Sequence, residues 1–276
     1  RASTNLAFSP ASHASSSPSG SHRPGADLSD SALVRINGVS RSFGNGALLK
    51  DVLAGASFEI RPGEIAALVG ANGVGKTTLL RIAMGLDQPN LGTVTRKVTG
   101  PQIGVVVQDY NRSLCPWLRC ADNIAMPLVS TIPDRAKRLD TVNKLVARLG
   151  QFAQLSSFPY QLSGGQRQIL CLLRALVHEP ALLVLDEAFS SLDHERKKAM
   201  HGTVAQYVEA RQAGVLLVSH DIDEVLLLAD RVLLLTGSPA AVEDAGQLRA
   251  PRPRSKEFLV SPQALAMRNR IWEELL

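Results

Sequence analysis

The sequence predicts an α/β fold with a mixed, largely parallel sheet, an N-terminal antiparallel β subdomain and an inserted helical subdomain. Three observations lead to this fold class. Short, continuous apolar runs recur along the chain, as in strands that are covered by helices on both faces. A glycine-rich turn joins one of these runs directly to a helical pattern. Residues 116–179 have helical rather than strand-like periodicity, which indicates the inserted subdomain.

The length and composition allow one or two globular domains. With 276 residues, of which 45% are hydrophobic, the chain can bury a substantial core. Lysine and arginine exceed aspartate and glutamate by 30 − 25 = 5, a diffuse charge that suits an anionic ligand or a membrane surface but does not predict nucleic-acid binding. Asp230 and Arg231 interrupt the apolar run at residues 225–235, so no segment is expected to span a bilayer. Any membrane role therefore requires a partner.

The cysteines predict no metal site. Cys115, Cys120 and Cys171 are odd in number and lack the paired spacing of zinc ligands. We expect reduced thiols in a cytosolic protein. Cys115 and Cys120 flank a Pro-Trp pair, and a redox switch there remains an alternative to two ordinary thiols.

The N-terminal 30 residues are predicted to be a disordered extension, because serine, proline and glycine dominate and periodic apolar positions are almost absent. The chain begins with Arg rather than Met, so this segment is left out of the fold prediction. The folded domain is predicted over residues 31–255, and a helical tail over residues 256–276.

The strands are predicted in the following order. "LVRINGV" and "GASFEIRPGE" open the folded domain and supply its antiparallel part. "IAALVG" then runs into the glycine loop and a helix over residues 76–85. Further apolar runs predict strands at residues 102–108, 181–187, 214–220 and 231–235.

The helical subdomain is predicted from its periodicity. A helix should end at Gly150, a typical stop residue. The tail sequence "PQALAMRNRIWEELL" is amphipathic, and we expect it to pack on its own domain, with a partner interface as the alternative. The apolar residues with helical spacing before Gly150 are Leu139, Val142, Leu145, Val146 and Leu149.

The glycine loop "GANGVGKTT" predicts a P-loop NTPase core. It satisfies the pattern G-x-x-x-x-G-K-[ST], in which backbone amides, an ammonium and a hydroxyl meet phosphates and Mg²⁺. The helix dipole adds to the same position. The apolar strand before the loop favours this interpretation over a plain strand-to-helix turn. The predicted nucleotide contacts are Gly70, Ala71, Asn72, Gly73, Val74, Gly75, Lys76, Thr77 and Thr78.

Two carboxylates follow the apolar run "LLVL" about a hundred residues later. Asp186 is predicted to hold Mg²⁺ through water, together with Thr77, and Glu187 to orient or deprotonate an attacking water. A solvated strand end would be the simpler explanation of an isolated Asp-Glu pair. Its position after the phosphate loop favours the catalytic interpretation.

"LSGGQ" at residues 162–166 places two glycines before a leucine-rich helix, and with this motif the chain resembles the ATP-binding-cassette (ABC) family of transport ATPases. The resemblance runs from about residue 33 to about residue 243. Further motifs appear in the family's order. Gln108 lies in "VVVQD", Asp193 in "SSLD" and His220 in "LLVSHD", and Phe43 stands 27 residues before Gly70.

The resemblance implies roles for these residues. Gln108 would lie near Mg²⁺ and the attacking water, His220 would contact the γ-phosphate, and Lys76 and Glu187 would complete the catalytic set. Asp193 would communicate across a dimer. Phe43 would stack on adenine, although this residue alone would equally suit a core position.

The resemblance also implies a head-to-tail homodimer that forms through ATP, in which each phosphate loop is covered by the other copy's "LSGGQ". Ser163, Gly164, Gly165 and Gln166 would then contact the neighbour's ATP. Because only ATP reaches both halves, ATP binding would close the pair and hydrolysis would release it.

Residues 108–128, "QDYNRSLCPWLRCADNIAMPL", resemble the corresponding segment of the nitrate, sulfonate and taurine importer ATPases, where it docks a permease helix. Pro116 and Trp117 would shape this groove. Trp117 in the core of the helical subdomain is the alternative. "GANGVGKTT" and "AFSSLD" differ from the usual sequences of these motifs in importers, but neither difference removes a catalytic atom.

These features predict an ATPase subunit of an importer, at the cytoplasmic face of a bacterial inner membrane. Two copies would serve two permease subunits and, indirectly, a solute-binding protein. The short spacing from Lys76 to Leu162, about 85 residues, excludes a long coiled-coil insertion. A soluble cassette ATPase serving a non-transport complex and a DNA-linked cassette ATPase remain alternatives. The solute is not encoded in this chain, because the solute contacts belong to other subunits.

Overall fold

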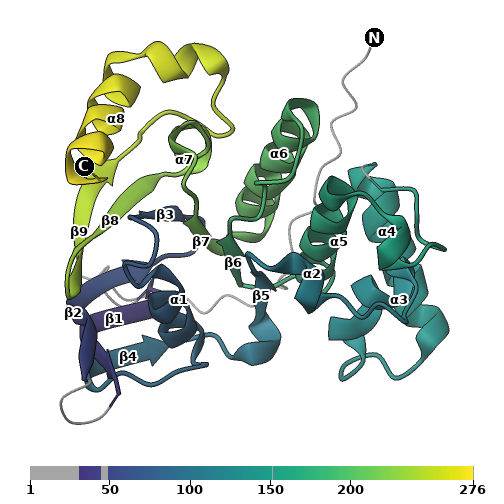
Figure 1. Ribbon diagram of the computed structural model, residues 1–276. Helices are drawn as coiled ribbons and strands as arrows, with labels where there is room; N and C mark the ends of the chain where they lie inside the picture. Colours follow the sequence, from purple (N-terminus) through teal and green to yellow (C-terminus); the bar gives the residue numbers. More distant parts are fainter. Residues whose placement is uncertain (1–30, 45–48, 151, 276) are drawn as a thin grey trace, which may run out of the picture.

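The computed structural model describes residues 31–44, 49–150 and 152–275. In this part of the chain the strands form one nine-stranded sheet in the order β4-β1-β2-β9-β8-β3-β7-β6-β5, with helices packed around it (Figure 1). The predicted α/β class and mixed sheet are confirmed. The extension predicted to be disordered lies outside the described residues.

The parallel part of the sheet matches the predicted apolar runs. Its strands are neighbours in the order β8, β3, β7, β6 and β5, and each pair is parallel. Nearly every residue of these strands is buried, which explains why they appear in the sequence as continuous rather than alternating apolar runs. The strands are β3 (Ile65–Val69), β5 (Ile103–Val106), β6 (Leu182–Asp186), β7 (Gly214–Val218) and β8 (Arg231–Gly237).

The antiparallel part continues the same sheet. β1 (Val34–Phe43) pairs with β2 (Lys50–Ile60) and β4 (Leu91–Arg96). β9 (Ala240–Gln247) pairs antiparallel with β8 and meets β2 in parallel at Leu53. The predicted antiparallel subdomain is therefore joined to the parallel core through β9. The sequence analysis predicted neither β4 nor β9.

The two faces of the sheet carry two hydrophobic clusters. Ala66 and Leu68 of β3 pack with α1 (Lys76–Met84) and the antiparallel strands. Ala67 and Val69 pack with the helices of the opposite face. Because neighbouring strand residues point to opposite faces, one short strand serves both clusters. The phosphate loop thus begins at a strand that is fixed from both sides.

The helical segment lies beyond β5, on the right in Figure 1. In it α3 packs against α4 and α5, and α2 against α5. As predicted, α4 buries Val142, Leu145 and Val146 and ends at Gly150, whose φ of 63° is left-handed. Its helices are α2 (Tyr110–Ser113), α3 (Cys120–Ala125), α4 (Arg135–Leu149) and α5 (Gly164–Leu176), with 3-10 turns at Met126–Leu128 and Pro159–Gln161.

Three further helices complete the fold: α6 (His194–Arg211), α7 (Ile222–Leu228) and α8 (Pro262–Leu275). α6 was not predicted. One face of α8 buries Ala264 and packs on α7, β8 and β9, which is the packing expected of the tail helix. Within the described residues, no helix is both long enough and apolar enough to cross a membrane.

Candidate functional site

The phosphate loop lies between β3 and α1, and its shape depends on glycine. Gly73 and Gly75 have φ values of 77° and 120°, which other residues rarely adopt. A Cβ atom on Gly75 would lie 2.9 Å from the Val52 side chain of β2. No side chain caps the first turn of α1. The loop therefore presents backbone amides and a positive helix end in a shape suited to an anion.

Lys76 holds its ammonium group inside this loop. Its Nζ donates to the carbonyl oxygens of Gly70 at 2.7 Å and Ala71 at 2.9 Å. Burial lowers the pKa of Lys76, while the nearby charges of Glu187 and Asp186 act in the opposite direction. The ammonium is thus held by neutral acceptors that an anionic phosphate can replace.

Two carboxylates stand at the end of β6, as predicted. Burial raises the pKa of Asp186 to about 6; the charge of Glu187 adds to this effect and Lys76 opposes it. Glu187 has a left-handed backbone with φ 51°, a costly conformation for glutamate. The Glu187 amide donates to the Val218 carbonyl at 2.9 Å, which anchors the turn to β7.

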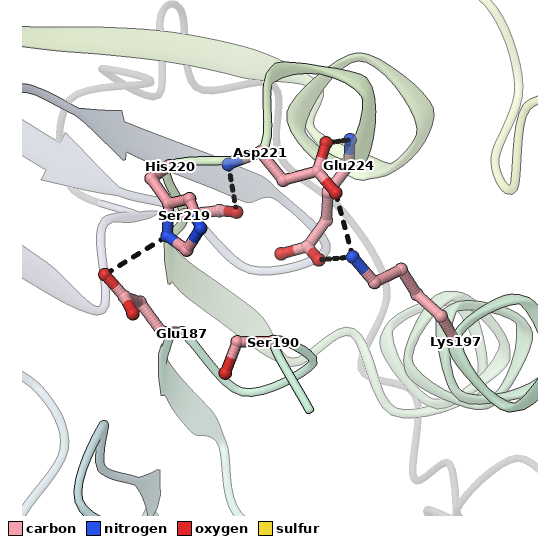
Figure 2. Close-up of a pocket in the computed structure, with 7 residues that line it drawn as sticks. All are labelled: Glu187, Ser190, Lys197, Ser219, His220, Asp221 and Glu224. Atoms are coloured by element: carbon pink, nitrogen blue, oxygen red, sulfur yellow. Dashed lines mark hydrogen bonds and ion pairs between the residues drawn. The ribbon is translucent and has the colours of Figure 1, made fainter. Parts of the chain in front are cut away.

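The structure brings Gln108, Glu187 and His220 together, although they lie far apart in the sequence. Gln108 Nε2 donates to Glu187 Oε2 at 3.0 Å. His220 Nδ1 lies 3.3 Å from Glu187 Oε1, and Figure 2 shows the two side chains pointing toward each other. These residues follow β5, β6 and β7, and the carboxyl ends of parallel strands share one edge of the sheet. Both oxygens of Glu187 therefore have a partner.

A cavity of about 220 Å³ adjoins Glu187 and His220, and Figure 2 shows the seven residues that line it. Lys197 donates to Asp221 at 2.8 Å and lies 3.5 Å from the buried Glu224. The Asp221 amide donates to Ser219 Oγ at 3.0 Å, and Asp221 caps α7. The segment that carries His220 is thus held on both sides of the histidine.

The "LSGGQ" segment forms the start of α5. Ser163 is the N-cap: its Oγ accepts from the Gln166 amide, and its own amide donates to Gln166 Oε1 at 2.9 Å. A Cβ on Gly165 would lie 3.1 Å from the Ser191 carbonyl, and one on Gly164 3.2 Å from Tyr110 Oη. The two glycines allow this close approach. The hydroxyl proton of Ser163 is not used by the cap and can serve an outside acceptor.

Within one chain, α5 lies apart from α1, with β6 and β5 between the two helices in the view of Figure 1. A family model described as ABC transporter matches residues 53–190, which include the phosphate loop, "LSGGQ" and both carboxylates. The chain belongs to the ABC transporter family. It is an ATP-binding ATPase of that family, as its motifs predict.

Known ABC proteins resemble the chain over most of its length. An aliphatic sulfonates import ATP-binding protein, SsuB 1 of Xanthomonas axonopodis pv. citri, is 36% identical over 233 residues, 82% of this chain and 90% of the relative. The nitrate transport protein NasD of Klebsiella oxytoca is 33% identical over 231 residues, 81% of this chain and 88% of the relative. A solved dimeric bacterial ABC transporter cassette has a TM-score of 0.70 and 24% identity, covering 79% of this chain and 100% of that chain, and so shares the fold.

The structure decides two alternatives for aromatic residues of this ABC chain. Phe43 is 42% exposed at the end of β1, so it is not a core residue. The Arg41 guanidinium lies 4.5 Å from the centre of its ring. Trp117 is 74% exposed and is likewise not part of the core. The Trp117 ring is therefore accessible to a partner outside the chain, and the Phe43 ring is accessible where Arg41 does not cover it.

The remaining predicted residues are located as follows. Asp193 is exposed and caps α6, accepting from the Arg196 amide at 3.0 Å. Burial raises the pKa of Cys120 to about 11 and also raises the pKa of the buried Cys171. All three cysteines are free thiols. Neither buried thiol has the lowered pKa that favours thiolate chemistry.

Sequence reasoning missed two buried polar residues that organise the loops of this site. Gln168 of α5 bonds to the turn after β6. Asn123 of α3 bonds to the backbone of Cys115, Leu118 and Arg119 and so fixes the loop that carries Trp117. One feature of the sequence could have indicated both residues: each is an amide side chain on an otherwise apolar helix face. A buried amide needs hydrogen-bond partners inside the protein.

Proposed function

We propose that this chain is the ATP-hydrolysing subunit of an ABC importer of the nitrate, sulfonate and taurine class. The placement of Glu187 between Gln108 and His220, at the sheet edge beside the phosphate loop, carries the proposal. A carboxylate held in this way at a nucleotide site suits the activation of water. The names of the relatives, which specify import of aliphatic sulfonates and transport of nitrate, support the class.

The phosphate loop binds the nucleotide. The amides of residues 70–78 surround the phosphates, and the positive end of α1 favours their charge. Lys76 exchanges the carbonyls of Gly70 and Ala71 for phosphate oxygens and so gains charge-assisted bonds. Adenine stacks on the exposed ring of Phe43.

The residues beside the loop suit Mg²⁺. Thr77, Asp186 and Gln108 offer hydroxyl, carboxylate and amide oxygens, which are ligands that Mg²⁺ prefers. In the described part of the chain, no three His, Cys, Asp or Glu side chains gather into a set that could hold a metal alone. This agrees with an ion that is shared with nucleotide phosphates. When bound, Mg²⁺ neutralises charge on those phosphates.

Glu187 is the general base in hydrolysis. Gln108 fixes one of its oxygens and helps to orient the attacking water. As the water oxygen bonds to the γ-phosphorus, the bond to the ADP oxygen breaks and Glu187 takes the water's proton. His220, which contacts the other oxygen of Glu187, donates to the γ-phosphate.

A second copy of the chain completes the site. Ser163 and the amides at the start of α5 donate to the γ-phosphate of the ATP held by the partner. Asp193, in the loop after β6, lies at the interface between the two copies. Because the phosphate loop and α5 lie apart in one chain, ATP joins two copies head to tail and its hydrolysis separates them.

The segment around Trp117 docks the permease. The exposed Trp117 offers an apolar anchor, and the buried Asn123 gives its loop a fixed shape. Through this contact the chain sits as a peripheral subunit on the cytoplasmic face of a bacterial inner membrane. A solute-binding protein acts in the same system without touching this chain.

Replacing Glu187 with Gln tests the mechanism. We expect steady ATP hydrolysis to fall by about 1,000-fold, while ATP affinity changes by less than about twofold and the ATP-bound dimer accumulates. Phosphate release measures hydrolysis, fluorescent-nucleotide titration measures the affinity, and light scattering measures the dimer. Glu209→Gln, an exposed change on α6, is the control and should keep the parental rate. Normal turnover by Glu187→Gln would contradict the assignment of the base.

Co-purification tests the importer role. Capture of a multi-span permease by the native chain, and its loss in Trp117→Ala, are the expected results. A soluble scaffold partner, or DNA-stimulated ATP turnover, would instead favour one of the non-transport alternatives. Thermal-shift screening of the co-purified binding protein against sulfonates and nitrate then identifies the solute.

A further inference from the structure

We propose that Gln168, a buried residue of α5, is the positioning residue for the catalytic base Glu187. This inference rests on the proposed role of Glu187 and adds a residue to which the motifs give no task. Gln168 does not reach the nucleotide pocket itself. It acts through the turn that joins β6 to α6, and it connects that turn to the helix that begins with "LSGGQ".

Gln168 bonds to both ends of the turn that follows β6. Its Nε2 donates to the Glu187 carbonyl at 3.0 Å and to Ser190 Oγ at 3.3 Å. Its Oε1 accepts from the Ser191 amide at 2.9 Å. The side chain is 1% exposed, so water cannot replace these bonds. The Gln168 amide group therefore holds the turn at Glu187, Ser190 and Ser191, in addition to the turn's own backbone bond from the Ser190 amide to the Glu187 carbonyl at 3.3 Å.

The Glu187 backbone needs such support. Its left-handed conformation persists only where the surroundings hold it. On one side the Glu187 amide bonds to Val218 of β7, and on the other the Glu187 carbonyl bonds to Gln168 of α5. The carboxylate then reaches Gln108 and His220 from a backbone that is fixed at both ends.

Only glutamine combines the length, the donor and the acceptor that this place requires. Glutamate has the same shape but, when ionised, lacks the donor for the Glu187 carbonyl. Methionine has a similar length and neither group. Gln168 also lies one helical turn after Gly164, so any displacement of the "LSGGQ" end by ATP of the second copy moves the anchor of this chain's own base.

The test replaces Gln168 with Met and measures binding and turnover separately. We expect kcat for ATP hydrolysis to fall by about 10-fold to 100-fold, since small misplacements of a catalytic group have effects of this size. ATP affinity, measured with a fluorescent nucleotide, should change by less than about twofold. Leu172→Met places the same side chain one turn later in the buried face of α5 and should keep kcat. Gln168→Glu keeps the length and the acceptor, removes the donor and adds a buried carboxylate, and should lower kcat at least as much as Met does.

A double-mutant cycle distinguishes this inference from the proposed function. In a Glu187→Gln background, the Gln168→Met change should alter the residual rate by less than about twofold, because the group it positions is already absent. If Glu187→Gln abolishes turnover but both Gln168 variants hydrolyse ATP at the parental rate, the inference is wrong and the proposed function stands. An equal loss in both backgrounds also overturns it. Full turnover by Glu187→Gln would overturn both.

Discussion

Two regions of this chain differ in how their functional side chains are bonded. The phosphate-loop half comprises the loop at residues 70–78 and the carboxyl ends of the neighbouring strands, and the "LSGGQ" half is the start of α5. In the first half, bonds within the chain already set the chemistry: Lys76 is held by the loop carbonyls and Glu187 by Gln108. In the second half, Ser163 and Gln166 bond to each other across the first turn of α5. The contrast supports the proposal that one copy supplies the groups for nucleotide binding, whereas closure needs two.

Mutations in the two halves should therefore separate nucleotide binding from dimer closure. A change in the phosphate-loop half should weaken every ATP-dependent step. A change in the "LSGGQ" half should leave the isolated copy able to bind ATP. A change that loosens the helical segment as a whole should affect its stability and leave the sheet edge intact.

Lys76→Ala should have the largest effect. Removing the ammonium leaves the phosphates without their charged donor, so we expect ATP affinity to fall by about 100-fold and hydrolysis to become undetectable. Fluorescent-nucleotide titration measures the affinity. Lys144→Ala is the matched control, because Lys144 is 76% exposed on α4 and should be without effect. Near-parental ATP binding by Lys76→Ala would contradict the expectation that changes in the phosphate-loop half weaken ATP binding.

Ser163→Arg should prevent closure and leave nucleotide binding by the single copy intact. The long cation blocks the approach of a second copy and removes the α5 cap, a loss of about 1 kcal/mol of stability. We expect ATP affinity of the single copy to stay within about twofold, while the ATP-driven dimer of the Glu187→Gln chain disappears in light scattering. Ser130→Arg, at an exposed position of the helical segment, should dimerise normally. Unimpaired closure of the Ser163→Arg chain would mean that α5 does not cover the neighbour's ATP.

Asn123→Ala should loosen the helical segment and have the smallest effect on hydrolysis. The change leaves the amide and carbonyl of Cys115 without their buried partner, for which we expect a loss of about 2–3 kcal/mol in the free energy of unfolding. Urea unfolding measures this loss. The kcat of the folded protein should change by less than about twofold, and Asn143→Ala on the exposed face of α4 should change neither quantity. A large loss of kcat would mean that the two halves are more tightly coupled.

The sequence predicted best what depends on local residues. The phosphate loop follows from its glycines and lysine, and the parallel strands follow from runs that the sheet buries on both faces. The helix α6 was not predicted because its buried face includes two polar residues, His201 and Thr203, which break the apolar periodicity. Most residues of β4 and half of those of β9 are exposed, so these strands lack the apolar runs that marked the other strands.

The parts of the site that could not be predicted depend on contacts between distant segments. The family resemblance placed Gln108 and Glu187 near the same water, but only the fold shows that their side chains bond directly. Gln168 belongs to no catalytic motif, and its task depends on the approach of α5 to the turn after β6. A buried amide reveals that partners must exist, while the fold alone determines which ones they are.

Under the proposed mechanism, the left-handed backbone of Glu187 sets protein stability against catalysis. Glycine and asparagine adopt this conformation at lower cost than glutamate does, and neither can take a proton from water. Selection of variants for heat resistance alone would therefore favour glycine or asparagine in place of Glu187, although either replacement would end ATP turnover. Thermal screening of such variants has to be paired with an ATPase assay, because the most thermostable variant recovered will otherwise be an inactive one.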